Sequence, residues 1–129
     1  MGHPNEDLVR RGYDAFSSGD VQTLRELWDP DIVWHVPGRG QVSGDHRGVD
    51  AVLGYFGQLM ELTGGALRVE VHDVVANDKH AVGLHSTHAE RAGKTLDDNN
   101  ILVFHVRDGK VTEVWQYQAD QYAADELFG

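Results

Sequence analysis

Apolar residues recur at helical spacing in three segments of the first half of the chain. The spacing predicts helices over residues 5–17, 21–28 and 49–62. Asn5 and Asp20 are residue types that cap helix N-termini, and Gly19 and Pro30 are placed to end the first two helices. An apolar run over residues 31–36 predicts a short strand, and a polar, glycine-rich loop follows it.

Alternating apolar and polar residues dominate the second half. The pattern predicts strands over residues 67–75, 80–90, 95–106 and 111–118. In the first of these, Leu67, Val69 and Val71 share one face. Turn-forming pairs separate the strands, and Asp108-Gly109 is a strong hairpin signal. The tail DQYAADELFG can form a helical turn capped by Asp120.

This order of elements is typical of an α+β fold, in which a curved antiparallel sheet wraps three helices. Long antiparallel strands twist and curl. A curled sheet closed by helices leaves a conical cavity suited to a small molecule. Because no repeat, linker or low-complexity segment divides the chain, residues 1–129 are expected to form a single domain.

The composition narrows the classes of function. The chain has no cysteine, which excludes disulfides and thiolate chemistry. Its formal net charge of −10 opposes binding to nucleic acid or to an anionic membrane. No apolar run has the character of a signal peptide or the length of a membrane span, so a cytoplasmic location is expected. Neither a metal nor a cofactor is expected, because the histidines lack ligand spacing and the glycine-rich loop matches no phosphate-binding pattern.

Four stretches of the chain resemble a known family. They are Y-x-A-F-x-x-G-D at 13–20, PDIVWHVPG at 30–38, GVDAVLGYFGQL at 48–59 and DGKVTEVW at 108–115. With the element order, they are similar to the SnoaL-like branch of the NTF2-like superfamily, which includes ketosteroid isomerases and polyketide cyclases. The resemblance covers nearly the whole chain and implies the NTF2-like cone. It leaves the activity open, because members catalyse many reactions and some only bind.

The resemblance also places the catalytic positions of the isomerases on this chain. Aligned on Gly19-Asp20 and on the last hairpin, these positions fall on Gly12, Val36 and Leu102. The isomerase chemistry needs a tyrosine and two aspartates there. The resemblance therefore implies a protein that is not a typical ketosteroid isomerase, with Tyr13 beside the lost tyrosine position.

His35 is a conspicuous candidate for a catalytic base. Alternation puts Ile32, Trp34 and Val36 on one face of the strand and His35 on the other. The first face is the more apolar, and the resemblance implies that this face lines the pocket. We therefore expect His35 to point to the outer face of the sheet, although a bulge before Pro37 would turn it inward.

The same parity predicts the other residues of the pocket. Asp98 and His85 are the candidates for acid–base catalysis, because burial raises the pKa of a carboxylate and lowers the pKa of an imidazole. The expected substrate-binding residues are Tyr13, Trp34, Val36, Phe56, Asn100, Leu102, Gln116 and Gln118. The alternative is that the polar members only satisfy one another in a water-filled cavity. Trp115 and Tyr117 fall on the outer face, where the resemblance implies a homodimer contact.

Three functions fit this pattern. A cofactor-independent SnoaL-like enzyme would move a proton on a small, mostly apolar, oxygenated substrate, as a cyclase, isomerase or hydrolase does. A non-catalytic binding module would hold a small hydrophobic ligand in the same pocket. A pure assembly domain would have a pocket plugged by its own side chains.

Overall fold

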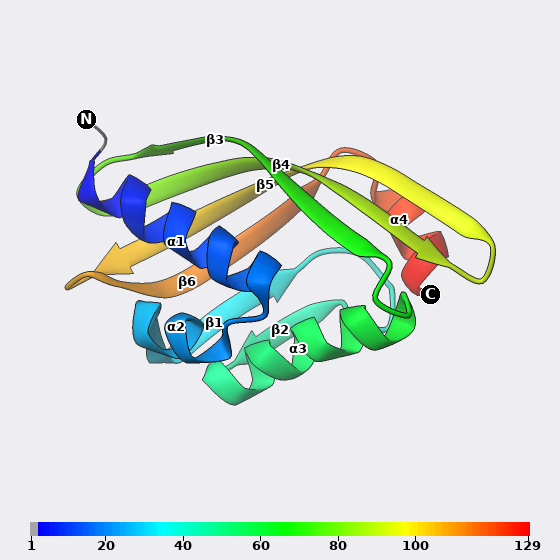
Figure 1. The fold of residues 1–129 in the computed structure, drawn as a ribbon, viewed down its shortest axis with the longest axis horizontal. Helices are drawn as coiled ribbons and strands as arrows, with labels where there is room; N and C mark the ends of the chain where they lie inside the picture. Colours follow the sequence, from blue (N-terminus) through cyan, green and yellow to red (C-terminus); the bar gives the residue numbers. More distant parts are fainter. Residues whose placement is uncertain (1–2) are drawn as a thin grey trace.

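A computed structural model describes residues 3–129 as a curved sheet with four helices (Figure 1). The helices are α1 (Pro4–Ser18), α2 (Val21–Leu27), α3 (Val49–Leu62) and α4 (Gln121–Phe128). The strands are β1 (Trp28–Val36), β2 (Gly44–Arg47), β3 (Leu67–Ala76), β4 (His80–Arg91), β5 (Lys94–Arg107) and β6 (Lys110–Gln118). The expected α+β class with a curved sheet is confirmed.

The strands form one sheet in the order β2-β1-β6-β5-β4-β3. Consecutive strands from β3 to β6 pair antiparallel, as do β1 and β2. In contrast, β1 and β6 run parallel, with Trp34 opposite Val114 and His35 opposite Trp115. The expectation of a wholly antiparallel sheet is wrong at this pair. No hairpin joins these two strands, since all the elements from β2 to β5 separate them in the chain, so their relative direction is free to be parallel.

Two further elements differ from the prediction. The segment of β2 was expected to be loop, because its sequence GDHR has no apolar alternation, and its order comes from pairing with β1. The tail forms a complete helix, α4, in addition to the three helices expected. As predicted, Asp120 caps it, accepting a 3.0 Å hydrogen bond from the backbone N–H of Ala123.

The ends of α1 and α2 follow from their flanking residues. Pro4 begins α1 and His3, not Asn5, is its N-cap; the Asn5 side chain instead donates to the backbone oxygens of the β3–β4 turn. Gly19 ends α1 at a φ of 71°, a left-handed conformation that glycine adopts without strain. Asp20 then caps α2, as expected, through the backbone N–H of Thr23.

The alternation of β3 is interrupted by a bulge between Val71 and Asp73. The extra residue moves Val74 to the buried face, while Val75 is 54% exposed. The regular alternation predicted over residues 67–75 is therefore wrong beyond Val71. The first half keeps the predicted face, and Leu67 and Val69 reach the interior.

His35 lies on the outer face of the sheet, as expected. Its Nδ1 and Nε2 lie 2.6 and 2.5 Å from carboxylate oxygens of Asp45 and Glu113, and its ring stacks on Trp115. Partial burial lowers the pKa of His35, but the hydrogen bonds to Glu113 and Asp45 outweigh it, and the pKa is raised overall. On the same face Tyr117 is 52% exposed. A homodimer through this face stays a prediction.

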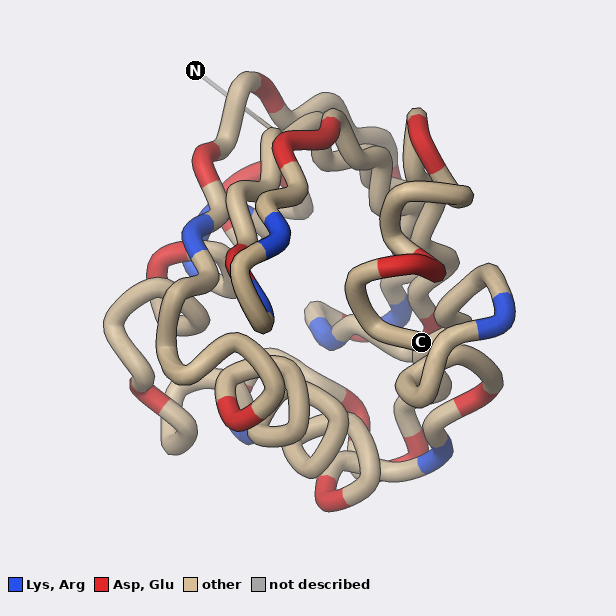
Figure 2. Tube along the Cα trace, turned by 90° about the vertical axis from the view of Figure 1, so that its right-hand side faces the viewer, with Lys and Arg blue, Asp and Glu red and all other residues tan. Residues whose placement is uncertain are grey.

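Acidic residues are spread along the whole trace, with the fewer Lys and Arg positions scattered between them (Figure 2). The negative charge is thus not confined to one segment. Within residues 3–129, no helix has the length and apolar character needed to cross a membrane.

Candidate functional site

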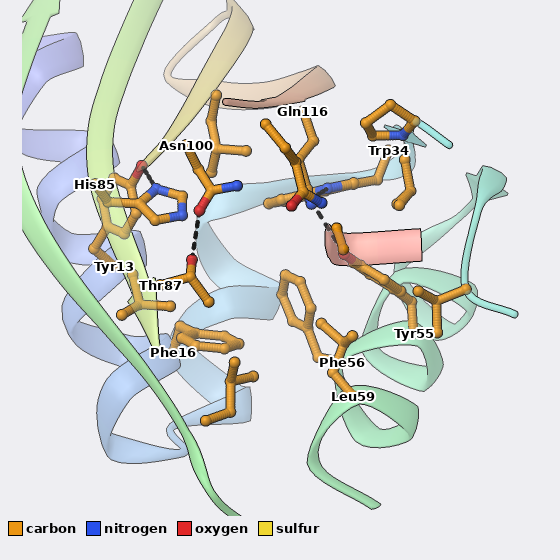
Figure 3. A pocket seen from close by; sticks show the side chains of 18 of the residues that line it. Tyr13, Phe16, Trp34, Tyr55, Phe56, Leu59, His85, Thr87, Asn100 and Gln116 are labelled. Carbon is orange, nitrogen blue, oxygen red and sulfur yellow. Dashed lines mark hydrogen bonds between the residues drawn. The ribbon is translucent and has the colours of Figure 1, made fainter. Parts of the chain in front are cut away.

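A cavity of about 120 Å³ lies between the inner face of the sheet and the helices (Figure 3). Its walls are mainly apolar, and several aromatic rings pack edge to face around it, as Trp34 and Phe56 do at 5.1 Å between centroids. The volume is on the order of the roughly 150 Å³ that holds a benzene ring. The hypothesis of a pure assembly domain required a plugged pocket, and this cavity does not support it.

All eight substrate-binding residues expected from the sequence line this cavity. They are Tyr13, Trp34, Val36, Phe56, Asn100, Leu102, Gln116 and Gln118. His85 of β4 lines it as well. The inward parity of β1, β4, β5 and β6 brings the strand residues of this set together, because alternate residues of neighbouring strands share one face. Tyr13 and Phe56 reach the cavity from α1 and α3.

A buried hydrogen bond joins α1 to β4 at the cavity wall. The Tyr13 hydroxyl lies 2.9 Å from Nδ1 of His85, and the two rings meet edge to face. Gly83 makes room for this contact, since a Cβ there would lie 2.3 Å from the Tyr13 hydroxyl oxygen. Burial raises the pKa of Tyr13 and lowers the pKa of His85 from 6.5 to about 4. Both groups are therefore uncharged at neutral pH.

The positions of the protons follow from the available partners. We assign the Tyr13 hydroxyl as the donor to Nδ1 of His85, because a phenol O–H is a stronger donor than an imidazole N–H and an imidazole nitrogen a stronger acceptor than a phenol oxygen. A neutral imidazole carries one proton, which then sits on Nε2. Nε2 lies on the side of the ring away from Tyr13, toward Asn100 (Figure 3).

Gln116 is held by two donors. Its Oε1 accepts from Nε1 of Trp34 at 3.2 Å and from the hydroxyl of Tyr55 at 3.1 Å. Burial raises the pKa of Tyr55, so its hydroxyl stays protonated. An indole nitrogen can only donate, so the amide must turn its oxygen toward Trp34 and its NH₂ group away.

Asn100 makes a similar contact on the neighbouring strand. The hydroxyl of Thr87 donates to Oδ1 of Asn100 at 2.6 Å. In the sheet, Asn100 is directly opposite His85. The imidazole and this amide are thus adjacent on the cavity wall (Figure 3).

Asp98 faces inward, as expected, but does not line the cavity. It is 8% exposed, and its carboxylate accepts hydrogen bonds from the backbone N–H of Asp120 at 3.1 and 3.2 Å. Its partner across the strands is Thr87 and not His85. The structure therefore does not bring Asp98 and His85 together as an acid–base pair; Asp98 fastens the start of α4.

Among the described residues, Asp125 of α4 is the one acidic side chain on the cavity lining. Its Oδ1 accepts hydrogen bonds from the backbone N–H of Arg39 and from Nε2 of Gln121, both at 2.9 Å. Gly38 allows this approach, since its φ is 93° and a Cβ would lie 2.2 Å from Oδ1. Sequence reasoning missed Asp125, Gln121 and Tyr55. The i,i+4 spacing of Gln121 and Asp125 was the available signal for the first two.

Residues 3–129 contain no group of three or more His, Asp or Glu side chains arranged to hold a metal ion. The polar side chains of the cavity lining include amides, hydroxyls, a hydroxyl-bound imidazole and one carboxylate. This set can orient an oxygen atom of a ligand and accept a proton from it.

Comparison with known proteins identifies the family. The SnoaL-like domain matches residues 9–114. The uncharacterised protein Rv0034 of Mycobacterium tuberculosis is 33% identical over 123 residues, which are 95% of this chain and 94% of that protein. The solved structure of Bal32a, from a soil-derived mobile gene cassette, is 40% identical with a TM-score of 0.94, covering 98% of this chain and 97% of that one. IdmH of Streptomyces antibioticus, proposed to be a polyketide cyclase, is 24% identical with a TM-score of 0.73, over 91% and 92% of the two chains. These matches confirm the resemblance seen in the sequence, and the chain belongs to the SnoaL-like domain family.

Proposed function

We propose that this protein binds a small, mostly apolar, oxygenated molecule in the cavity and moves a proton on it without a cofactor. The Tyr13–His85 pair carries the proposal, because it holds an uncharged imidazole at the wall of an otherwise apolar cavity. Burying a titratable group in this way costs stability compared with an apolar side chain, and such groups cluster at functional sites.

His85 suits the role of a hydrogen-bond donor to the reacting oxygen. With its pKa lowered to about 4, the imidazole is a weak base near neutral pH. Its Nε2–H can instead donate to a ligand carbonyl and stabilise the negative charge that develops when an adjacent carbon loses a proton. Tyr13 is a positioning residue in this scheme, since its hydroxyl fixes the tautomer of the imidazole.

Asp125, in place of the expected Asp98, takes the role of proton acceptor. Two donors hold its Oδ1, and its Oδ2 has no partner among the hydrogen bonds of residues 3–129. In the proposed step the C–H bond beside the carbonyl breaks, its proton passes to Oδ2, and its electron pair becomes an enolate. The enolate can then take the proton back at another atom, as in an isomerisation, or attack a second carbonyl, as in a cyclisation. The fold similarity to IdmH makes cyclisation a natural candidate.

A binding module of the same fold is the second candidate. The observation that favours it is the loss of acid at Val36 and Leu102, where the isomerases carry their two aspartates and which both line the cavity. In this case the same contacts would hold a ligand without a reaction.

Deuterium exchange at carbon distinguishes the two. Acetophenone, 1-indanone and 2-tetralone are incubated with the protein in deuterated buffer, and deuterium uptake beside the carbonyl is followed by mass spectrometry. We expect exchange of at least one bound ketone to exceed the buffer rate and to fall about 100-fold in Asp125→Asn, the typical contribution of a general base. Glu126→Gln is the matched control, since Glu126 is the exposed neighbouring acid on α4.

Each remaining outcome has one meaning. Ketones that bind but exchange at the buffer rate would overturn the enzyme and leave the binding module. Ketones that neither bind nor exchange would overturn the cavity as the functional site.

A further inference from the structure

Three polar side chains on the sheet wall of the cavity already accept hydrogen bonds from other side chains of the protein. In the tautomer assigned above, Nδ1 of His85 accepts from Tyr13, and Oδ1 of Asn100 accepts from Thr87. Oε1 of Gln116 accepts from two donors, an indole and a phenol. Each of the three keeps an N–H group to offer a ligand. Oε1 of Gln116 has no lone pair left, whereas Oδ1 of Asn100, which accepts one bond, keeps a second.

The orientation of Gln116 is the firmest of the three. Its carbonyl oxygen faces Trp34 Nε1 at 3.2 Å, and an indole N–H cannot act as an acceptor. Turning the amide over would bring two donors together and leave both unpaired in a buried place, at a cost of about 1–3 kcal/mol for each group. The NH₂ group therefore stays directed away from Trp34.

The free N–H groups open on the cavity. In residues 3–129, every side-chain nitrogen or oxygen atom that is sealed from solvent has a hydrogen-bond partner. Nε2 of His85 and the amide nitrogens of Asn100 and Gln116 have no protein partner, so they are accessible from the cavity.

These donors come from three adjacent strands. His85 on β4 is opposite Asn100 on β5, and Leu102, two residues further along β5, is opposite Gln116 on β6. Figure 3 shows the three side chains in a row along the wall. We call His85, Asn100 and Gln116 the donor row. Side chains with free acceptor atoms, Gln118 and Asp125, lie toward α4.

We propose that the donor row selects a ligand oxygen that has no hydrogen of its own: the carbonyl of a ketone, enone, quinone or ester, or the enolate formed from it. This rests on the proposed function and names the chemical class of its ligand. A carbonyl oxygen has two lone pairs and can accept from two of the three donors at once. An alcohol beside Gln116 would find no acceptor for its own O–H there, because Oε1 already accepts two bonds, and such an unpaired buried group is penalised.

Three probes with one carbon skeleton test the proposal. Acetophenone carries a carbonyl, 1-phenylethanol a hydroxyl and ethylbenzene no oxygen. Their dissociation constants are measured by NMR titration of the full-length protein. We expect acetophenone to bind about tenfold more tightly than either of the others, equivalent to one net hydrogen bond of about 1.4 kcal/mol.

The Gln116→Glu variant assigns the preference to the donor row. A glutamate keeps acceptors for Trp34 and Tyr55 but replaces the amide NH₂ group by a second acceptor oxygen. We expect acetophenone to lose affinity, 1-phenylethanol to gain it, and ethylbenzene to be unchanged, which also shows that the cavity is intact. Gln22→Glu is the matched control, because it makes the same change at an exposed position of α2. Asn100→Asp repeats the test in the same row should Gln116→Glu fail to fold.

The outcomes separate this inference from the proposed function. Equal binding of acetophenone and 1-phenylethanol would overturn the inference and leave the pocket in place. A preference that Gln116→Glu and Asn100→Asp both leave unchanged would overturn its assignment to the donor row. Failure of all three probes to bind would overturn both this inference and the cavity as a binding site.

Discussion

Replacing His85 with glutamine should flatten the dependence of stability on pH on the acid side. His85 is 8% exposed, and burial lowers its pKa from 6.5 to about 4. In the unfolded chain the imidazole regains its ordinary pKa, so between these values the unfolded state binds more protons than the folded state. The part of the stability that depends on uncharged His85 is therefore complete above pH 6.5 and is lost as the pH falls toward 4. One pKa unit corresponds to about 1.4 kcal/mol, so protonation linked to His85 lowers the free energy of unfolding by about 2 kcal/mol between pH 7 and pH 5.

Urea denaturation at pH 5, 6, 7 and 8 measures this directly. The wild-type free energy of unfolding should fall by about 2 kcal/mol more than that of His85→Gln between pH 7 and pH 5. His72→Gln is the control, since it removes an exposed histidine of β3. Parallel curves for the wild type and His85→Gln would refute the reasoning, because the cavity would not then hold the imidazole uncharged. The role of its Nε2–H in the donor row would lose its basis.

Four other predictions concern single contacts. Gly83→Ala should displace the tyrosine bound to His85 and lower the free energy of unfolding by about 1–3 kcal/mol in urea denaturation. Its control, Gly54→Ala on the exposed face of α3 with open space around it, should raise that free energy by about 0.5–1 kcal/mol. No loss of stability in Gly83→Ala would contradict the prediction. His35→Gln should lower the melting temperature more at pH 5.5 than at pH 8.5, because a raised pKa stabilises below the ordinary value and the effect is lost as pH rises through the folded value; an equal loss would contradict it. Asp98→Ala should speed amide exchange at the start of α4 and cost about 1–2 kcal/mol, whereas lost turnover with stability unchanged would return Asp98 to the catalytic site. Tyr117→Arg should shift the protein toward a monomer in light scattering, and a wild-type monomer would reject the homodimer.

The pocket residues on strands could be predicted because strand parity is a local property. Trp34, Leu102 and Gln116 each sit at an alternate position within a stretch of regular strand pairing, so the face of one residue fixes the face of the next. The same rule predicted that His35 points to the outer face of the sheet. Where the strand carries a bulge, as β3 does at residue 72, the rule fails, because nothing in LRVEVHDVV marks the extra residue.

Parity fixes the face of a residue but not how far along the sheet the cavity extends. Asp98 is on the predicted face, yet it lies two residues beyond Asn100 toward the β4–β5 turn, where the chain leaving β6 crosses it. Its carboxylate meets the backbone of Asp120 there. This contact joins residues distant in the chain, and the spacing of polar residues along β5 holds no information about it.

The position of helix α4 is a second feature that the local sequence pattern could not predict. Its eight residues are too few to be stable alone, so its place is decided by contacts from elsewhere in the chain. Arg91 donates to the backbone oxygen of Leu127 at 2.7 Å, and Gln41 donates its backbone N–H to that of Phe128 at 2.7 Å. These bonds hold α4 so that Asp125 reaches the cavity. The isomerases of the superfamily carry their acids on strands, where sequence parity can find them. In the mechanism proposed for this chain the donors remain on strands and the acid comes from a docked helix, so the sequence could predict only the first half of the site.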